Sequence, residues 1–147
     1  MSQNNPPREA VLQLLNDGID HAFQNIILTY WDDAPFVPFS ISDKWTIMRF
    51  ANQTEDGMIE VSEEVIEQGK NMSLKNEMNN NITAFVHDWR LASEQWKQDA
   101  IILCIYDFID KKVYVFWMMY SVVKKIFRKP KIEELWNPKL ISLDEME

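Results

Sequence analysis

Paired carboxylates are the first residues of this chain whose types and spacing could do chemistry. They occur at Asp32-Asp33, Glu63-Glu64 and Glu133-Glu134. Two neighbouring carboxylates can bind a divalent cation or divide acid–base work between them. Asp32-Asp33 stands out because Tyr30 and Trp31 precede it and bring aromatic rings close to the charges. A solvated loop is the simpler interpretation of this pair, and Glu63-Glu64 fits the acidic start of a helix.

The histidines and the single cysteine offer little for catalysis. His87 precedes Asp88, and a histidine beside a carboxylate could act as a general base. On a strand, however, adjacent side chains point to opposite faces, so these two are not expected to form a dyad. Cys104 lies in the apolar run Ala100 to Tyr106, which indicates core packing rather than an activated thiolate. His21 is expected to be solvated on the first predicted helix.

Motifs that hold cofactors are missing from the sequence. The three glycines are scattered, so no phosphate-binding loop of the G-x-x-x-x-G-K-[ST] or G-x-G-x-x-G type is present. The chain has one cysteine, and neither histidine has another at ligand spacing, which argues against a zinc site. We therefore predict no metal and no cofactor, and we favour a protein that is not an enzyme.

The charge of the chain limits its partners. The 147 residues carry 15 Lys and Arg against 23 Asp and Glu, a net charge of -8. This charge repels nucleic acid and anionic lipid and attracts a basic partner. The longest apolar stretch, Val113 to Val123, is much shorter than the ~20 residues that span a bilayer. We therefore expect neither a nucleic-acid nor a membrane partner. We also expect a cytoplasmic location, because a lone cysteine requires no oxidising compartment.

Hydrophobic periodicity predicts two helices. Apolar residues recur at spacings of three and four from Arg8 to about Thr29, and they form one stripe. The stretch Tyr30 to Pro35 is then predicted as a connector. A turn at Asp56-Gly57 precedes a second helix, from Met58 or Ser62 to Lys70. The polar stretch from Asn71 to Asn81 is predicted as a loop or a frayed helix end.

Five β-rich segments follow or separate these helices. They are Phe36 to Ile41, Lys44 to Ala51, Ile82 to His87, Asp99 to Asp107 and Lys112 to Ser121. For the third segment a strand is favoured, although the apolar spacing of residues 82–96 also fits a helix. The first two and the last two are each predicted as a hairpin. Pro38 cannot donate to a ladder, so the first segment is predicted as an edge strand or a strand end.

These elements predict the α+β class, with two helices packed on one face of a mainly antiparallel sheet. A single domain is expected over residues 1–147. Residues 1–7 are predicted as a flexible N-terminus and residues 124–147 as a C-terminal extension, in which Ile132 to Trp136 forms one helical turn. The residues expected to be buried on the central hairpin are Ile102, Cys104, Val115 and Trp117.

A sequence pattern in the C-terminal half resembles small bacterial α+β proteins of unassigned activity. It begins with His87-Asp88-Trp89 and continues through Gln98 to Leu103. The Val113 to Phe116 segment and Asn137-Pro138 follow in the same order, so the resemblance covers residues 84–140. It implies successive antiparallel strands that lead to a C-terminal extension, and it implies no activity.

An acidic, aromatic-rich chain without motifs predicts a non-enzymatic binding protein. One concrete version neutralises or inhibits a basic protein, as an immunity protein does. Two alternatives stay open: a small enzyme or ligand-binding domain that uses carboxylates, and a structural subunit of a homo-oligomer. The predicted partner-binding residues are Tyr30, Trp31, Asp32 and Asp33, which combine an aromatic anchor with charge complementarity.

Overall fold

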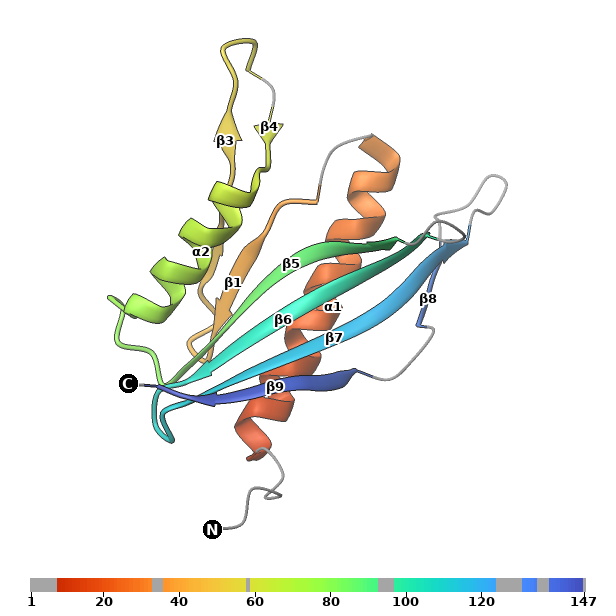
Figure 1. Cartoon of the computed structure of the whole chain (residues 1–147). Helices are drawn as coiled ribbons and strands as arrows, with labels where there is room; N and C mark the ends of the chain where they lie inside the picture. The colour runs from red at the N-terminus through yellow and green to blue at the C-terminus, as the bar shows by residue number, and fades with distance from the viewer. Residues whose placement is uncertain are drawn as a thin grey trace.

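The computed structural model describes residues 8–32, 36–57, 59–92, 97–123, 131–134 and 138–146. Two helices and nine strands lie in these ranges (Figure 1). They are α1 (Glu9–Asp32), β1 (Phe39–Ser42), β2 (Ile47–Arg49), β3 (Asn52–Gln53), β4 (Ile59–Glu60), α2 (Glu63–Lys75), β5 (Ile82–Ala92), β6 (Lys97–Asp107), β7 (Lys112–Val123), β8 (Lys131–Glu134) and β9 (Lys139–Glu145).

One antiparallel sheet organises the molecule. Its strand order is β2-β1-β5-β6-β7-β8, and β9 pairs with another part of β7. The strands β3 and β4 form a separate ribbon that projects from the body at the top of Figure 1. The α+β class, the two helices and the mainly antiparallel sheet expected from the sequence are thus confirmed.

The two helices cover opposite faces of the sheet, so the expectation that they share one face is wrong. Gly18 of α1 approaches Leu103 and Val86, whereas Gly69 of α2 approaches Phe85. Because neighbouring side chains on a strand point to opposite faces, α1 and α2 must lie on either side of β5. Figure 1 shows α1 crossing behind the central strands. The physical reason is that residues 82–87 are all buried, and such a strand needs cover on both faces.

Both helices extend beyond their predicted ends. The first continues through Tyr30, Trp31 and Asp32, which therefore form its last turn instead of a connector. The sequence has no Gly or Pro between Thr29 and Pro35 that would end the helix earlier. The second helix has Ser62 as its N-cap and ends at Lys75, five residues later than predicted.

The polar stretch after the second helix is an ordered turn. Asn76 caps α2 in the left-handed conformation, with φ 53°. Its side-chain amide donates to the carbonyl of Asn80 at 2.9 Å, and its side-chain oxygen accepts from the Asn80 amide at 2.8 Å. This reciprocal pair leads the chain directly into β5.

The C-terminal segment completes the sheet. Residues 131–134 form β8 on β7 instead of the predicted helical turn, and Lys139–Glu145 forms β9 on the same strand. Of the residues expected in the core, Ile102 and Cys104 are buried, while Val115 and Trp117 are only half-buried. Val115 and Trp117 lie on β7 and are less covered, because α2 packs on β1, β5 and β6. Residues 1–7 and 124–130 lie outside the described residues.

Candidate functional site

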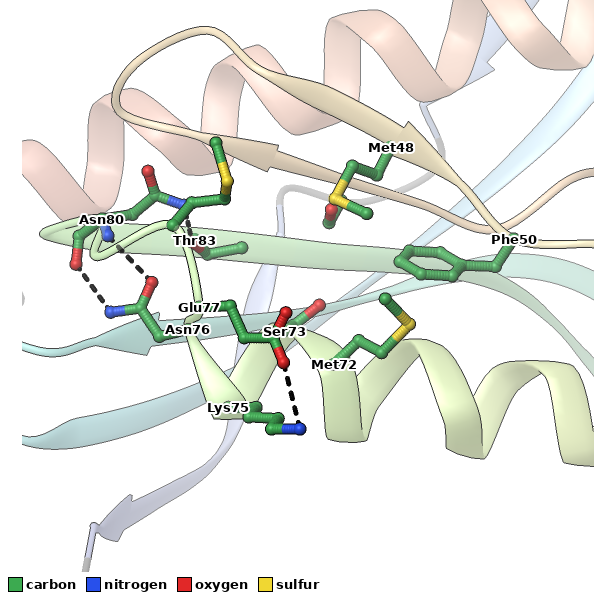
Figure 2. Close-up of a pocket in the computed structure, with 11 residues that line it drawn as sticks. Met48, Phe50, Met72, Ser73, Lys75, Asn76, Glu77, Asn80 and Thr83 are labelled. Carbon is green, nitrogen blue, oxygen red and sulfur yellow. Dashed lines mark hydrogen bonds and ion pairs between the residues drawn. The ribbon is translucent and has the colours of Figure 1, made fainter.

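A cavity of about 280 Å³ lies between the C-terminal half of α2 and the β2 end of the sheet. Figure 2 shows Met48 and Phe50 on one side of it, with Met72 and Ser73 of α2 on the other. The remaining lining residues are Ser40, Lys75, Asn76, Glu77, Met78, Asn80 and Thr83. The cavity therefore joins the hairpin, α2 and the start of β5.

Strand alternation turns the sheet residues toward this cavity. Ser40 on β1 pairs with Met48 on one side and with Phe85 of β5 on the other, so the three side chains share the α2 face. Ser40, Ser73 and Thr83 are all buried. The Ser73 hydroxyl donates to the Gly69 carbonyl at 2.8 Å. Small hydroxyl side chains thus form the inner part of the cavity.

The mouth of the cavity is rimmed by methionines. Met48, Met72 and Met78 are 39%, 44% and 61% exposed, although their side chains are apolar. Phe50 is buried behind them, with its ring centre 5.7 Å from that of Phe85. Unbranched thioether side chains adapt to differently shaped apolar groups, which is why methionine is frequent at surfaces that accept varied partners.

Hydrogen bonds hold the walls of the cavity in place. The Asp43 carboxylate, in the β1–β2 turn, accepts from the Asn81 backbone amide at 3.1 Å and from its side chain at 3.2 Å. The Lys44 ammonium donates to the carbonyls of Met78 and Asn79, at 3.2 Å each. The hairpin turn is therefore tied to the turn after α2, and these bonds fix two walls of the cavity relative to each other.

Negative charge is concentrated next to the cavity. The β3–β4 ribbon and the first half of α2, here called the acidic arm, carry six exposed carboxylates. They are Glu55, Asp56, Glu60, Glu63, Glu64 and Glu67. The sequence has no Lys or Arg between Arg49 and Lys70. A groove of about 710 Å³ runs along this part of α2. Glu64 and Glu67 line it, and it shares Met72 and Lys75 with the cavity.

The groups that line the cavity suit binding better than catalysis. Its two charged side chains, Lys75 and Glu77, pair with each other at 3.0 Å and are about 70% exposed. His87 lies elsewhere on β5, and its Nδ1 is 2.9 Å from the backbone carbonyl of Asp88 and not from the carboxylate. Burial raises the pKa of the Cys104 thiol and so disfavours the nucleophilic thiolate, while it lowers the pKa of His87 and favours a neutral imidazole.

Within the described ranges, no group of three or more His, Cys, Asp and Glu side chains is arranged to hold a metal ion. Neither α1 nor α2 is both long and apolar enough to cross a membrane.

The structure describes the partner-binding residues predicted from the sequence only in part. Tyr30, Trp31 and Asp32 form the end of α1, while their side chains and the whole of Asp33 lie outside the described residues. Their role stays a prediction. The sequence did not predict the methionine rim, although Met48 and Phe50 fall on the same face of the predicted strand.

Comparison with known proteins gives no match: no protein-family model matches the chain, and no curated protein or solved structure is significantly similar to it.

Proposed function

We propose that this protein is a non-enzymatic binding protein that captures a segment of a basic protein partner. An apolar side chain of the partner enters the methionine-rimmed cavity, and Lys or Arg residues lie against the acidic arm. The observation that carries the proposal is the continuity of the two surfaces, since Met72 lines both the cavity and the groove of Glu64 and Glu67.

The size of the cavity favours a single anchoring side chain. At about 280 Å³ it lies at the lower limit of the ~300–1,000 Å³ typical of small-molecule sites. A partner side chain that fills a desolvated pocket is the usual centre of a binding hot spot. The rim of Met48, Met72 and Met78 would adjust to an aromatic or a branched aliphatic anchor.

The acidic arm supplies charge complementarity. Exposed carboxylates attract a basic partner at long range and raise the association rate more than the final affinity. A neutralising or inhibitory role towards a basic protein is the version of binding that best uses a net charge of -8. The proposal includes a cytoplasmic location, because the free, buried thiol of Cys104 requires no oxidising compartment.

Selection from a displayed library of random dodecapeptides tests this function. Peptides enriched on the native protein should contain an apolar residue near Lys or Arg. They should lose roughly tenfold or more in affinity for Met72→Glu, which places a charge at the cavity mouth (tenfold is about 1.4 kcal/mol). Leu74→Glu is the matched control, because Leu74 is 48% exposed on the same helix and does not line the cavity.

Two results of this selection would contradict the proposal. If the enriched peptides bound Met72→Glu and Leu74→Glu equally well, the cavity would not be the binding site. If they were acidic, the basic character of the partner would be wrong.

A further inference from the structure

We infer that the partner segment binds as an additional antiparallel strand on β2 and delivers its anchor to the cavity from that position. This inference rests on the proposed function and adds the binding mode, the direction of the segment and the place of its charges. It is drawn from the free edge of the sheet, from the direction of the β2 side chains and from the position of the acidic arm.

The β2 strand is an edge of the sheet described by the structure. It stands first in the strand order, and Ile47, Met48 and Arg49 are all exposed. The Thr46 carbonyl accepts from the Ser42 amide at 3.2 Å, and the Phe50 amide donates to the Pro38 carbonyl at 2.9 Å. Since these backbone groups alternate along an antiparallel strand, those of Ile47 and Arg49 point away from β1. They are the donors and acceptors that a partner strand requires.

An added strand would place one side chain at the cavity mouth. Residues directly opposite each other on paired strands share a face, and neighbouring strands lie about 4.8 Å apart. The partner residue opposite Met48 therefore projects on the α2 face, next to Met48 and toward Met72. The two β2 residues on either side of Met48 lie on the other face, because they pair with Phe39 and Ile41 of the α1-side core.

The position of the acidic arm determines which end of the partner segment should be basic. An antiparallel partner runs from Arg49 toward Ile47, so residues before its anchor lie on the side where the chain continues into β3. The acidic arm begins there, with β3 at Asn52–Gln53 and Glu55 shortly after it. Figure 1 shows the β3–β4 ribbon extending beyond the sheet at that end. The favoured partner therefore carries Lys or Arg on the N-terminal side of an apolar anchor.

Two blocked heptapeptides of identical composition are the probes. KTKTFTT has its lysines before the phenylalanine, whereas TTFTKTK reverses the order. Amide hydrogen exchange is followed by NMR at Ile47, Met48 and Arg49 of the native protein. KTKTFTT should slow exchange at Ile47 and Arg49 but leave Met48 unchanged, because the Met48 amide already faces β1. The reversed peptide should bind more weakly.

A pair of variants separates the backbone from the side chain. Ile47→Pro removes the outward N–H, and Ile47→Thr keeps it while removing most of the apolar side chain. We expect Ile47→Pro to weaken KTKTFTT roughly tenfold, about 1.4 kcal/mol, and Ile47→Thr to bind it like the native protein. If Ile47→Pro does not fold, the exchange pattern of the native protein decides the question alone.

Three outcomes would overturn the inference. If KTKTFTT shifted the Met72 signals without slowing exchange at Ile47 and Arg49, the cavity would capture the anchor and strand addition would be wrong. If neither peptide bound, this basic-apolar chemistry and the proposed function would both fail. If the native protein formed a concentration-dependent dimer that Ile47→Pro abolished, a second copy of the chain would occupy the edge.

Discussion

At the scale of single residues, Asp107 shows how this small domain keeps a charge in its interior. Its side chain is fully buried at the end of β6. Arg8 donates to both carboxylate oxygens, at 2.6 and 2.7 Å, and the amides of Ile109 and Asp110 donate at 3.1 and 3.3 Å. Burial alone would raise the pKa of Asp107, but these bonds outweigh it and hold the pKa below the usual value.

Arg8→Ala should therefore destabilise the protein by about 2–4 kcal/mol, since it leaves a buried carboxylate without its cation. Urea unfolding at neutral pH measures the effect. Because the folded pKa of Asp107 is lowered, the contribution of the pair is complete above the unfolded pKa of about 3.9 and is lost as the pH falls through the folded pKa. The gap between the native protein and Arg8→Ala should close in that acidic range.

The matched control is Glu77→Gln, which removes one partner of the exposed Lys75–Glu77 pair. It should change stability by less than about 1 kcal/mol. Equal losses from the two variants would show that the Arg8–Asp107 contact does not support the fold.

His87 gives a second prediction at this scale. It is 3% exposed, and its Nε2 atom is buried without a hydrogen-bond partner among the described residues. Burial lowers its pKa, so below about pH 6.5 the unfolded chain binds more protons than the native state. Stability should be constant above that pH and should decrease as the pH falls below it.

His87→Gln should flatten part of this decrease, because the replacement cannot be protonated. His21 has a pKa lowered mainly by burial, so His21→Gln is a second comparison and should act in the same direction. Thermal unfolding between pH 5 and 8 provides the measurement. An unchanged pH profile in His87→Gln would mean that His87 is not a source of acid sensitivity.

Local sequence patterns indicated the burial of some residues correctly but not the exposure of others. Cys104 was expected in the core and is buried, because apolar residues surround it on a long central strand. Trp45 lies in the β-rich segment from Lys44 to Ala51, yet it is 68% exposed. It stands just after the β1–β2 turn in the left-handed conformation, with φ 62°, and such backbone geometry follows from the turn and not from the alternating pattern.

At the scale of elements, one glycine in each helix lies where the helix packs against the sheet. An added Cβ at Gly69 would meet the Phe85 ring, with Cζ at 2.7 Å, and the Phe50 ring at 3.2 Å. An added Cβ at Gly18 would meet only the ends of flexible side chains, Leu103 Cδ2 at 3.1 Å and Val86 Cγ2 at 3.5 Å. Without such contacts, replacing either glycine with alanine would stabilise its helix by about 1 kcal/mol.

Gly69→Ala should therefore destabilise the protein by about 1–3 kcal/mol, while Gly18→Ala should be neutral or stabilising. Chemical denaturation of the two variants tests the difference. A stabilising Gly69→Ala would contradict the close packing of α2 against the sheet.

Periodicity recovered most elements, including α1, α2 and the long strands β5, β6 and β7, because each has a strong apolar pattern. It could not assign faces, since a strand that is apolar on both sides does not show which helix covers which side. It also missed β8 and β9, whose pattern is weak. Ile141 and Leu143, for example, are 54% and 40% exposed, and the register with β7 shifts between Val115 and Phe116.

At the scale of the whole molecule, charge and apolar surface meet on the α2 side. The charge balance alone predicted a basic partner, but the place of the contact depends on long-range packing. Met48 and Met72 are 24 residues apart in sequence and come together only when α2 docks beside the hairpin. The predicted site at Tyr30 to Asp33 rested on local sequence, which carries no information about such pairs.

The salt dependence of peptide binding tests whether the acidic arm attracts the basic residues of the partner. Glu64→Gln combined with Glu67→Gln should weaken KTKTFTT binding by about 0.5–2 kcal/mol and flatten its decrease with added salt, because exposed charges are screened. Asp17→Asn combined with Asp20→Asn on α1 is the matched control, and it should leave the salt slope unchanged. The same slope in both double variants would show that the acidic arm does not contact the peptide.

The most direct test of the central claim is a titration of KTKTFTT followed by the methyl signals of the eight methionines. The signals of Met48, Met72 and Met78 should shift together and saturate. Met118 and Met119, which are buried on β7, should not move. Binding that leaves the three cavity methionines unshifted, or that shifts Met118 and Met119 instead, would contradict the assignment of this cavity as the binding site.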